Sequence, residues 1–233
     1  EQSAINAILG IGLTFVIISA GIDLSVGSIL ALCGLVVADL LVAGHSNVVA
    51  IGGGLLVGLL CGGLNGLITT LGRIPPFITT LALMMVARGL AFLITGGFSI
   101  YQVPEALPWL GHGRTLGVPH TVTLLIGLYA AAHVFMSTTR LGRYIYAVGG
   151  NEEAARLSGV PVKRTKIIAY TLCGAFAGLD KLIAGRGKGT SIGFFHEAFS
   201  WSNSAGKGSL YVPKKFTFNK FSWNGSAIHS QEF

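Results

Sequence analysis

Long runs without a charged residue dominate the first 180 positions of this chain. The first run, Ala4–Ile22, holds 19 residues without a Lys, Arg, Asp or Glu. A helix of about 20 apolar residues is long enough to cross a bilayer. Only 11% of the 233 residues are charged, whereas a soluble globular domain is about 25% charged. The chain is therefore expected to be an integral membrane protein.

Six such runs are expected to form membrane-spanning helices. Period-2 alternation is absent, so helices are the expected way to satisfy backbone hydrogen bonds in lipid. The last run is expected to fail at Asp180 and Lys181. The predicted fold class is an all-α polytopic transmembrane bundle with five to six spans. The runs are Ala4–Ile22, Val26–Ala43, Val48–Leu71, Pro76–Thr95, Val118–Met136 and Ile167–Leu179.

The distribution of basic residues predicts the orientation of these spans. Cytoplasmic loops of membrane proteins carry an excess of Lys and Arg. Ser137–Lys166 is interpreted as a charged loop, and it holds six basic residues, so we expect it in the cytoplasm. Counting back through the spans puts Arg73 inside and the 96–117 connector outside. That connector holds Arg114 as its one basic residue.

Within the charged loop, the segment from Gly149 to Gly159 is expected to form one short helix. Asn151 is a good N-cap residue, and the acidic Glu152 and Glu153 favour the positive end of a helix. Gly159 is the expected C-terminal stop. A helix of two turns is not stable alone in water, so it must pack against something. Two interpretations stay open: a helix lying on its own membrane domain, or a docking helix for a cytoplasmic partner.

Four polar side chains in or beside the apolar runs are candidates for a translocation path. Ionisable groups are costly in lipid and usually face the bundle interior or water. Asp23 is interpreted either as a structural cap near the interface or as part of the route of a polar solute, and Ser25 as a cap of the next helix. Asn65 is either an interhelical hydrogen-bond partner or a path residue. Arg88 is either a snorkelling side chain or a path residue.

No catalytic or metal site is predicted. The chain has no GxSxG motif, no HExxH motif and no P-loop, so we do not expect it to hydrolyse ATP. Cys33, Cys61 and Cys173 lie far apart in apolar runs and are expected to be free thiols. Residues 181–233 carry 7 Lys and Arg against 2 Asp and Glu. No nucleic-acid-binding motif accompanies that charge, so no nucleic-acid partner is expected.

Four segments carry a resemblance to a known family. The sequence over roughly residues 3–179 resembles the ribose-type permease subunits of bacterial ABC importers. This resemblance implies a multi-pass protein of the inner membrane, with about ten helices in the whole family pattern. The segments are GIDLSVGS at Gly21–Ser28, NG at Asn65–Gly66, GRIPPFITTLA at Gly72–Ala82 and TTRLGRYIYAVGGNEEAARLSGVPV at Thr138–Val162.

The resemblance also implies a function and a set of partners. It implies import of a monosaccharide such as ribose, with ATP bound by partner subunits and no cofactor in this chain. The implied partners are an ABC ATP-binding subunit, a second permease copy, a periplasmic sugar-binding protein and membrane lipid. The short loop helix would be the coupling helix that docks on the ATP-binding subunit. Its coupling residues would be Gly149, Gly150, Asn151, Glu152, Glu153, Ala154, Ala155 and Leu157.

Alternative functions stay open beside this one. A branched-chain amino acid or nucleoside permease of the same superfamily would use the same coupling helix with a different solute lining. A secondary transporter also has broken helices and polar groups near the bilayer midplane. It has no ATPase for a loop helix to bind, so the docking helix discriminates between the two classes.

The sequence departs from the family pattern at both ends. It starts in what resembles the second span of the family. After Leu179 it changes to a basic segment without a spanning run. We therefore expect a permease domain over residues 1–180 and a non-family tail over residues 181–233. The tail is expected to be disordered or frame-shifted and not to span the membrane.

Overall fold

The computed structural model describes residues 2–96, 114–115, 118–183, 222–224 and 227–229. The chain divides into two units, Glu1–Lys188 and Gly189–Phe233. The described residues of the second unit form an antiparallel pair of strands, β3 (Ser222–Asn224) and β4 (Ala227–His229). The expectations for the tail 181–233 therefore lie almost entirely outside the described residues.

The described part of the first unit is helical apart from one pair of two-residue strands, and the predicted all-α membrane fold is confirmed. A pair of two-residue strands, β1 (Arg114–Thr115) and β2 (Val118–Pro119), directly precedes α6. The helices are α1 (Gln2–Ile18), α2 (Val26–Val42), α3 (Asn47–Leu71), α4 (Pro76–Thr95), α6 (His120–Thr138), α7 (Arg140–Gly150), α8 (Glu152–Leu157) and α9 (Val162–Ile183).

Among the described residues, α3, α4 and α6 are long and apolar enough to cross a membrane. The helices α1 and α2 are apolar but shorter. Each of the six predicted runs forms a helix, and α4 has the predicted bounds. Local signals explain the agreement at α4: Pro76 stands at its first position, and Gly96 ends it with a left-handed φ of 60°.

Three predicted boundaries are wrong. The first helix ends at Ile18 and not at Ile22, because the chain turns at Ala20, whose φ is 57°. The last helix runs through Asp180 and Lys181 to Ile183, since charged residues end a hydrophobic run without ending a helix. The segment Ser137–Lys166 is not a loop, because α7, α8 and the first turn of α9 occupy it.

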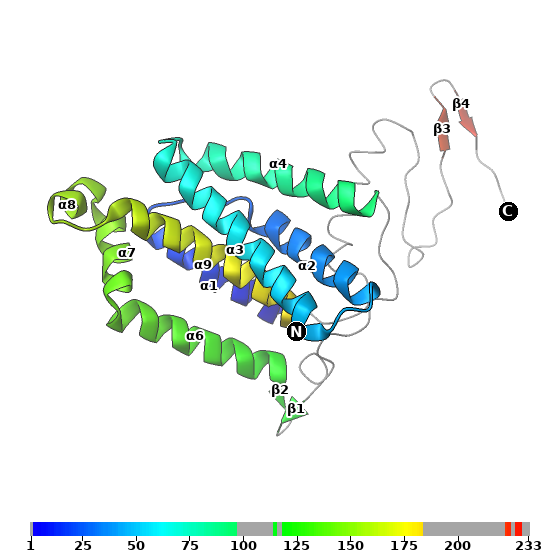
Figure 1. Ribbon diagram of the computed structural model, residues 1–233, viewed down its shortest axis with the longest axis horizontal. Coiled ribbons are helices and arrows are strands. Elements are labelled where there is room, and N and C mark those ends of the chain that lie inside the picture. Colours follow the sequence, from blue (N-terminus) through cyan, green and yellow to red (C-terminus); the bar gives the residue numbers. More distant parts are fainter. Residues whose placement is uncertain (1, 97–113, 116–117, 184–221, 225–226, 230–233) are drawn as a thin grey trace. The chain divides into compact units, whose positions relative to one another are not determined.

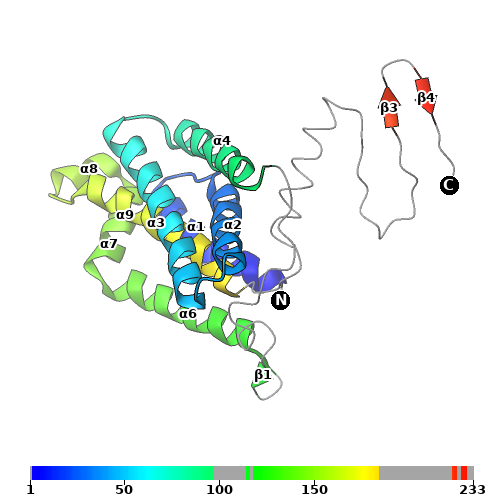
Figure 2. The same cartoon turned by 45° about the vertical axis from the view of Figure 1, so that its right-hand side comes forward.

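Close packing of α3 against α9 forms the centre of the first unit, and both views show the two helices side by side (Figures 1 and 2). The buried glycines Gly58, Gly62 and Gly66 recur every four residues on α3. A Cβ on Gly58 would overlap the carbonyl oxygen of Gly174 in α9, and a Cβ on Gly62 would overlap that of Tyr170. The two backbones therefore touch directly, as small residues allow between membrane helices.

The basic segments and the uncharged turn between α2 and α3 lie at opposite ends of the first unit (Figure 1). The turn from α3 to α4, which holds Arg73, lies at the same end of the first unit as α7 and α8 (Figure 1). The turn from α2 to α3 lies at the opposite end. Figure 1 also shows α7 turned across the long helices and α8 beyond their ends. This arrangement is the one that the predicted alternation of spans requires.

Candidate functional site

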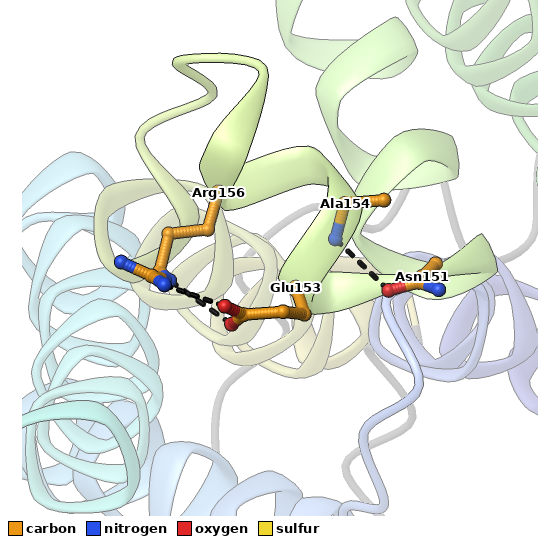
Figure 3. A network of polar contacts seen from close by, with 4 residues as sticks. All are labelled: Asn151, Glu153, Ala154 and Arg156. Atoms are coloured by element: carbon orange, nitrogen blue, oxygen red, sulfur yellow. Dashed lines mark hydrogen bonds and ion pairs between the residues drawn. The ribbon is translucent and has the colours of Figure 1, made fainter.

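Both ends of α8 are capped as the sequence predicts. At the N-terminus, the Asn151 side-chain oxygen accepts a hydrogen bond from the Ala154 amide at 2.9 Å (Figure 3). At the C-terminus, the Gly159 amide donates to the Arg156 carbonyl at 3.1 Å, and the Val160 amide donates to the Ala155 carbonyl at 3.0 Å. Gly159 has a φ of 82°, which completes a Schellman motif. An Asn N-cap stabilises a helix by about 1 kcal/mol relative to Ala.

The apolar side chains of α8 point in two directions. Ala155 is 5% exposed and packs against Val148 of α7, Val160 and Val162. Leu157 is 74% exposed, and Ala154 is exposed as well. The resemblance implies Ala155 as a coupling residue beside Ala154 and Leu157, so the burial of its side chain is a correction. A helix of six residues needs apolar support from its own chain, and Ala155 provides it.

Side chains of α8 form two ion pairs, one within the helix and one with α9. The Glu153–Arg156 pair stays within the helix, with the Arg156 Nε 3.0 Å from a carboxylate oxygen of Glu153 (Figure 3). Both side chains are exposed, and the Arg156 hydrogen bonds lower the pKa of Glu153. Glu152 instead binds the Nζ of Lys166, in α9, at 2.6 Å. Lys166 is only 16% exposed, so this second pair fixes α8 to the membrane helices.

The two glycines of the predicted coupling set belong to the end of α7 and not to α8. Gly150 is exposed, and a Cβ there would have no neighbour within 4 Å. A Cβ on Gly149 would overlap the carbonyl oxygen of Ile18, at the end of α1. The close approach requires glycine at 149, which therefore joins α7 to α1 within the chain.

The segment Ser19–Ser25 between α1 and α2, here called the break, carries the candidate path residues. Gly21, Asp23 and Ser25 are buried, whereas Ile22 and Leu24 are 52% and 42% exposed. Polar side chains thus face the protein interior and apolar ones face outward. That pattern is expected where a polar site lies inside a membrane bundle.

A chain of hydrogen bonds joins three of the four candidate path residues. The Asn65 side-chain amide donates to the Ser25 hydroxyl at 2.7 Å, and that hydroxyl donates to an Asp23 carboxylate oxygen at 2.6 Å. The Ser25 amide donates to the same oxygen at 2.9 Å. Ser25 directly precedes α2, but its side chain does not cap that helix. The predicted cap is therefore wrong, because Asp23 and Asn65 use the hydroxyl.

The network leaves acceptor atoms without a partner among the described residues. They are Asp23 Oδ2 and Asn65 Oδ1, both buried. A buried acceptor without a donor costs more than a hydrogen bond gains, so the site favours groups that donate, such as hydroxyls or water. Arg88 lies half-buried in α4 and forms no hydrogen bond or ion pair within the described part of the chain. The structure therefore does not join Arg88 to the network.

Tyr170 of α9 is a further residue of the site that the sequence prediction missed. It is 1% exposed, and its hydroxyl donates to the Ile22 carbonyl at 3.2 Å. A Cβ on Gly21 would lie 2.7 Å from that hydroxyl, so the break rests directly on the tyrosine. A buried Tyr needs a partner for its hydroxyl, and this requirement was the available signal. Sequence alone does not say which backbone oxygen provides that partner.

Comparison with known proteins places the chain in a family. Residues 1–180 match the family described as "Branched-chain amino acid transport system / permease component". The chain is 43% identical over 187 residues to the ribose import permease protein RbsC of Escherichia coli (strain K12), covering 78% of this chain and 58% of that protein. It is 42% identical over 181 residues to RbsC of Bacillus subtilis (strain 168), covering 77% and 56%.

A third relative is named for another sugar. The D-allose transport system permease protein AlsC of Escherichia coli (strain K12) is 37% identical over 186 residues, covering 78% of this chain and 56% of that protein. The chain thus spans little more than half of the length of these relatives. No solved structure matches it. The chain belongs to the branched-chain amino acid transport system permease component family, as a multi-pass protein of the bacterial inner membrane.

Proposed function

We propose that the full-length protein is the transmembrane permease subunit of an ABC importer that moves a monosaccharide such as ribose. The family membership and the names of the relatives support this proposal. The observation that carries it is α8, a helix with two caps that lies beyond the ends of the long helices (Figure 1). Its Leu157 is 74% exposed, although the helix itself is held firmly by Ala155 and by the Glu152–Lys166 pair.

In this proposal α8 is the coupling helix that binds to an ATP-binding subunit. Leu157 enters an apolar groove of that subunit, in the way that a helix binds a groove by its apolar face. Glu153 and Arg156 lie exposed beside it and set specificity and association rate at the rim. ATP is bound and hydrolysed by the partner, and this chain itself uses no cofactor.

Further partners complete the proposed importer. A second permease copy forms the other half of the pathway, and a periplasmic sugar-binding protein delivers the solute. Membrane lipid surrounds the bundle, with the exposed Arg140 and Arg143 of α7 at the level of anionic headgroups. No nucleic acid takes part.

The network in the break favours a sugar over an amino acid as solute. Asp23 Oδ2 and Asn65 Oδ1 are acceptors, and the hydroxyls of a sugar are donors for such atoms. A branched-chain amino acid, the solute in the family description, also carries a carboxylate, which binds most strongly to a cationic side chain. Two cations in the described helices are half-buried: Arg88 of α4 is not joined to the network, and Lys166 of α9 is paired with Glu152. A nucleoside permease of the same superfamily stays as an alternative, with the same coupling helix and a different solute lining. A secondary transporter is the other alternative, and the test below separates it, because such a transporter has no ATPase to bind.

A substitution at Leu157 tests the proposal. We expect Leu157→Asp in the full-length protein to abolish copurification of the ATP-binding subunit, because a carboxylate in an apolar groove costs several kcal/mol. Leu157→Met keeps an apolar side chain of similar volume and should copurify as the unchanged protein does. Equal insertion of both variants in the membrane fraction is the control. Full copurification of Leu157→Asp would show that α8 does not dock through this residue.

A further inference from the structure

The structure brings the coupling helix and the candidate path residues together at the break between α1 and α2. The start of the break follows Ile18, whose carbonyl oxygen a Cβ on Gly149 would overlap. Gly149 stands two positions before Asn151, which caps α8. The last turn of α7 thus touches the break at one side and continues into α8 at the other.

Two residues of α9, four positions apart, make the second connection. Lys166 binds Glu152 of α8 at 2.6 Å, and the Tyr170 hydroxyl donates to Ile22 of the break at 3.2 Å. Residues four apart lie on the same side of a helix. The same face of α9 therefore binds α8 through Lys166 and the break through Tyr170.

The break also contacts α3, which packs directly on α9. Asn65 of α3 donates to Ser25 at 2.7 Å. One turn before Asn65, Gly62 lies so close to α9 that a Cβ would overlap the Tyr170 carbonyl oxygen. Helices whose backbones touch cannot shift separately without losing this packing. A displacement of the first turns of α9 therefore affects both contacts of the break, the one with Tyr170 of α9 and the one with Asn65 of α3.

We propose that Lys166 and Tyr170 are positioning residues through which α8 controls the break. The role of an ATPase in moving α8 rests on the proposed function, whereas the link within the chain does not. When α8 shifts, Lys166 carries the shift into α9, and the Tyr170 hydroxyl leaves Ile22. The break then loosens, and the network of Asp23, Ser25 and Asn65 opens its acceptors to a solute that donates hydrogen bonds.

Hydrogen exchange of the break amides tests this link in the full-length protein in membranes, without any partner. We expect Tyr170→Phe to raise the exchange rate of the Ser19–Ser25 peptide about fivefold, the effect of one neutral hydrogen bond. Exchange of the α6 amides should not change. Tyr146→Phe is the matched control, because it removes a hydroxyl from an exposed tyrosine of α7 and should have no effect on the break.

The decisive variant acts at a distance from the break. Lys166→Gln removes the ion pair between α8 and α9, and we expect it to raise exchange in Ser19–Ser25 as well. Arg156→Gln also removes an ion pair of α8, but that pair stays within the helix, so exchange in the break should not change. In the double variant Lys166→Gln with Tyr170→Phe, we expect a rise smaller than the product of the two single effects, because coupled sites are not additive.

Three results would overturn the inference. They are no change at the break in Lys166→Gln, a double variant equal to the product of the singles, or a rise in α6 as large as that in the break. The outcome is independent of the proposed function. If Leu157→Asp still copurifies with the ATP-binding subunit, but the Lys166→Gln and Tyr170→Phe effects on exchange are coupled, docking is refuted and the link within the chain stands. If docking through Leu157 is intact, but the two effects on exchange multiply as independent effects do, only the link is refuted.

Discussion

Neighbouring glycines of α3 differ sharply in what surrounds them. A Cβ on Gly62 would overlap the Tyr170 carbonyl oxygen and lie 3.1 Å from the Gly174 Cα, whereas a Cβ on Gly63 would lie 3.6 Å from the Thr171 hydroxyl. Alanine favours a helix over glycine by about 1 kcal/mol at either position. The difference between the two substitutions therefore isolates the packing of α3 on α9.

We predict that Gly62→Ala lowers the stability of the full-length protein and that Gly63→Ala does not. Forcing a methyl group into a packed interface costs about 1–3 kcal/mol, which exceeds the gain in helix propensity. Thermal unfolding in detergent, followed by the loss of monodisperse protein, measures the difference. Equal midpoints for the two variants would mean that the helices separate easily at this contact.

Some residue roles follow from local sequence, and others need the folded chain. Asn151 and Gly159 are predictable as caps because each acts on amides and carbonyls within a few positions. The partners of Lys166 and Tyr170 are 14 and 148 residues away, and no periodic signal links such positions. Ala155 looks the same as Ala154 in the sequence, and only the packing of α7 and α9 decides which of them is buried.

Helices in the membrane are easier to predict than the helices that join them. Each of the six apolar runs lies in a helix, and in the described residues α3, α4 and α6 are long and apolar enough to span. The Pro75–Pro76 pair and Gly96 fix the ends of α4. In contrast, α7 contains Arg140, Arg143 and several glycines, so composition alone indicates a loop. Its buried residues Gly142, Ile145 and Val148 recur every three positions, and this pattern was the available signal for an amphipathic helix.

The break shows why the end of a span is harder to predict than its existence. The apolar run continues to Ile22, so hydropathy predicts a helix there. The chain turns at Ala20 because the polar groups of Asp23 and Ser25 need partners inside the bundle. That requirement involves α3 and α9, which lie far away in the sequence, so it overrides the local preference.

The arrangement of the whole first unit predicts which segments share a side of the membrane. The α2–α3 turn with His45 lies at one end, and α8 with Ser158 lies at the other (Figures 1 and 2). We predict that an impermeant thiol reagent labels His45→Cys in intact cells and leaves Ser158→Cys unlabelled until the cells are opened. Both positions are exposed, and a Cys61→Ala background removes the half-buried native thiol. Labelling of Ser158→Cys alone in intact cells would reverse the orientation.

The most direct measurement for the importer as a whole is a photo-crosslink from position 157 in native membranes. A photoreactive amino acid replaces Leu157 in the full-length protein, and another replaces His45 at the opposite end as control. If α8 is the coupling helix, position 157 forms an adduct with the ATP-binding subunit and position 45 does not, since an exposed side chain on a docking helix lies within contact distance of its partner. No adduct from position 157, with the ATP-binding subunit present in the same membranes, would contradict the assignment of this chain as a permease driven through α8.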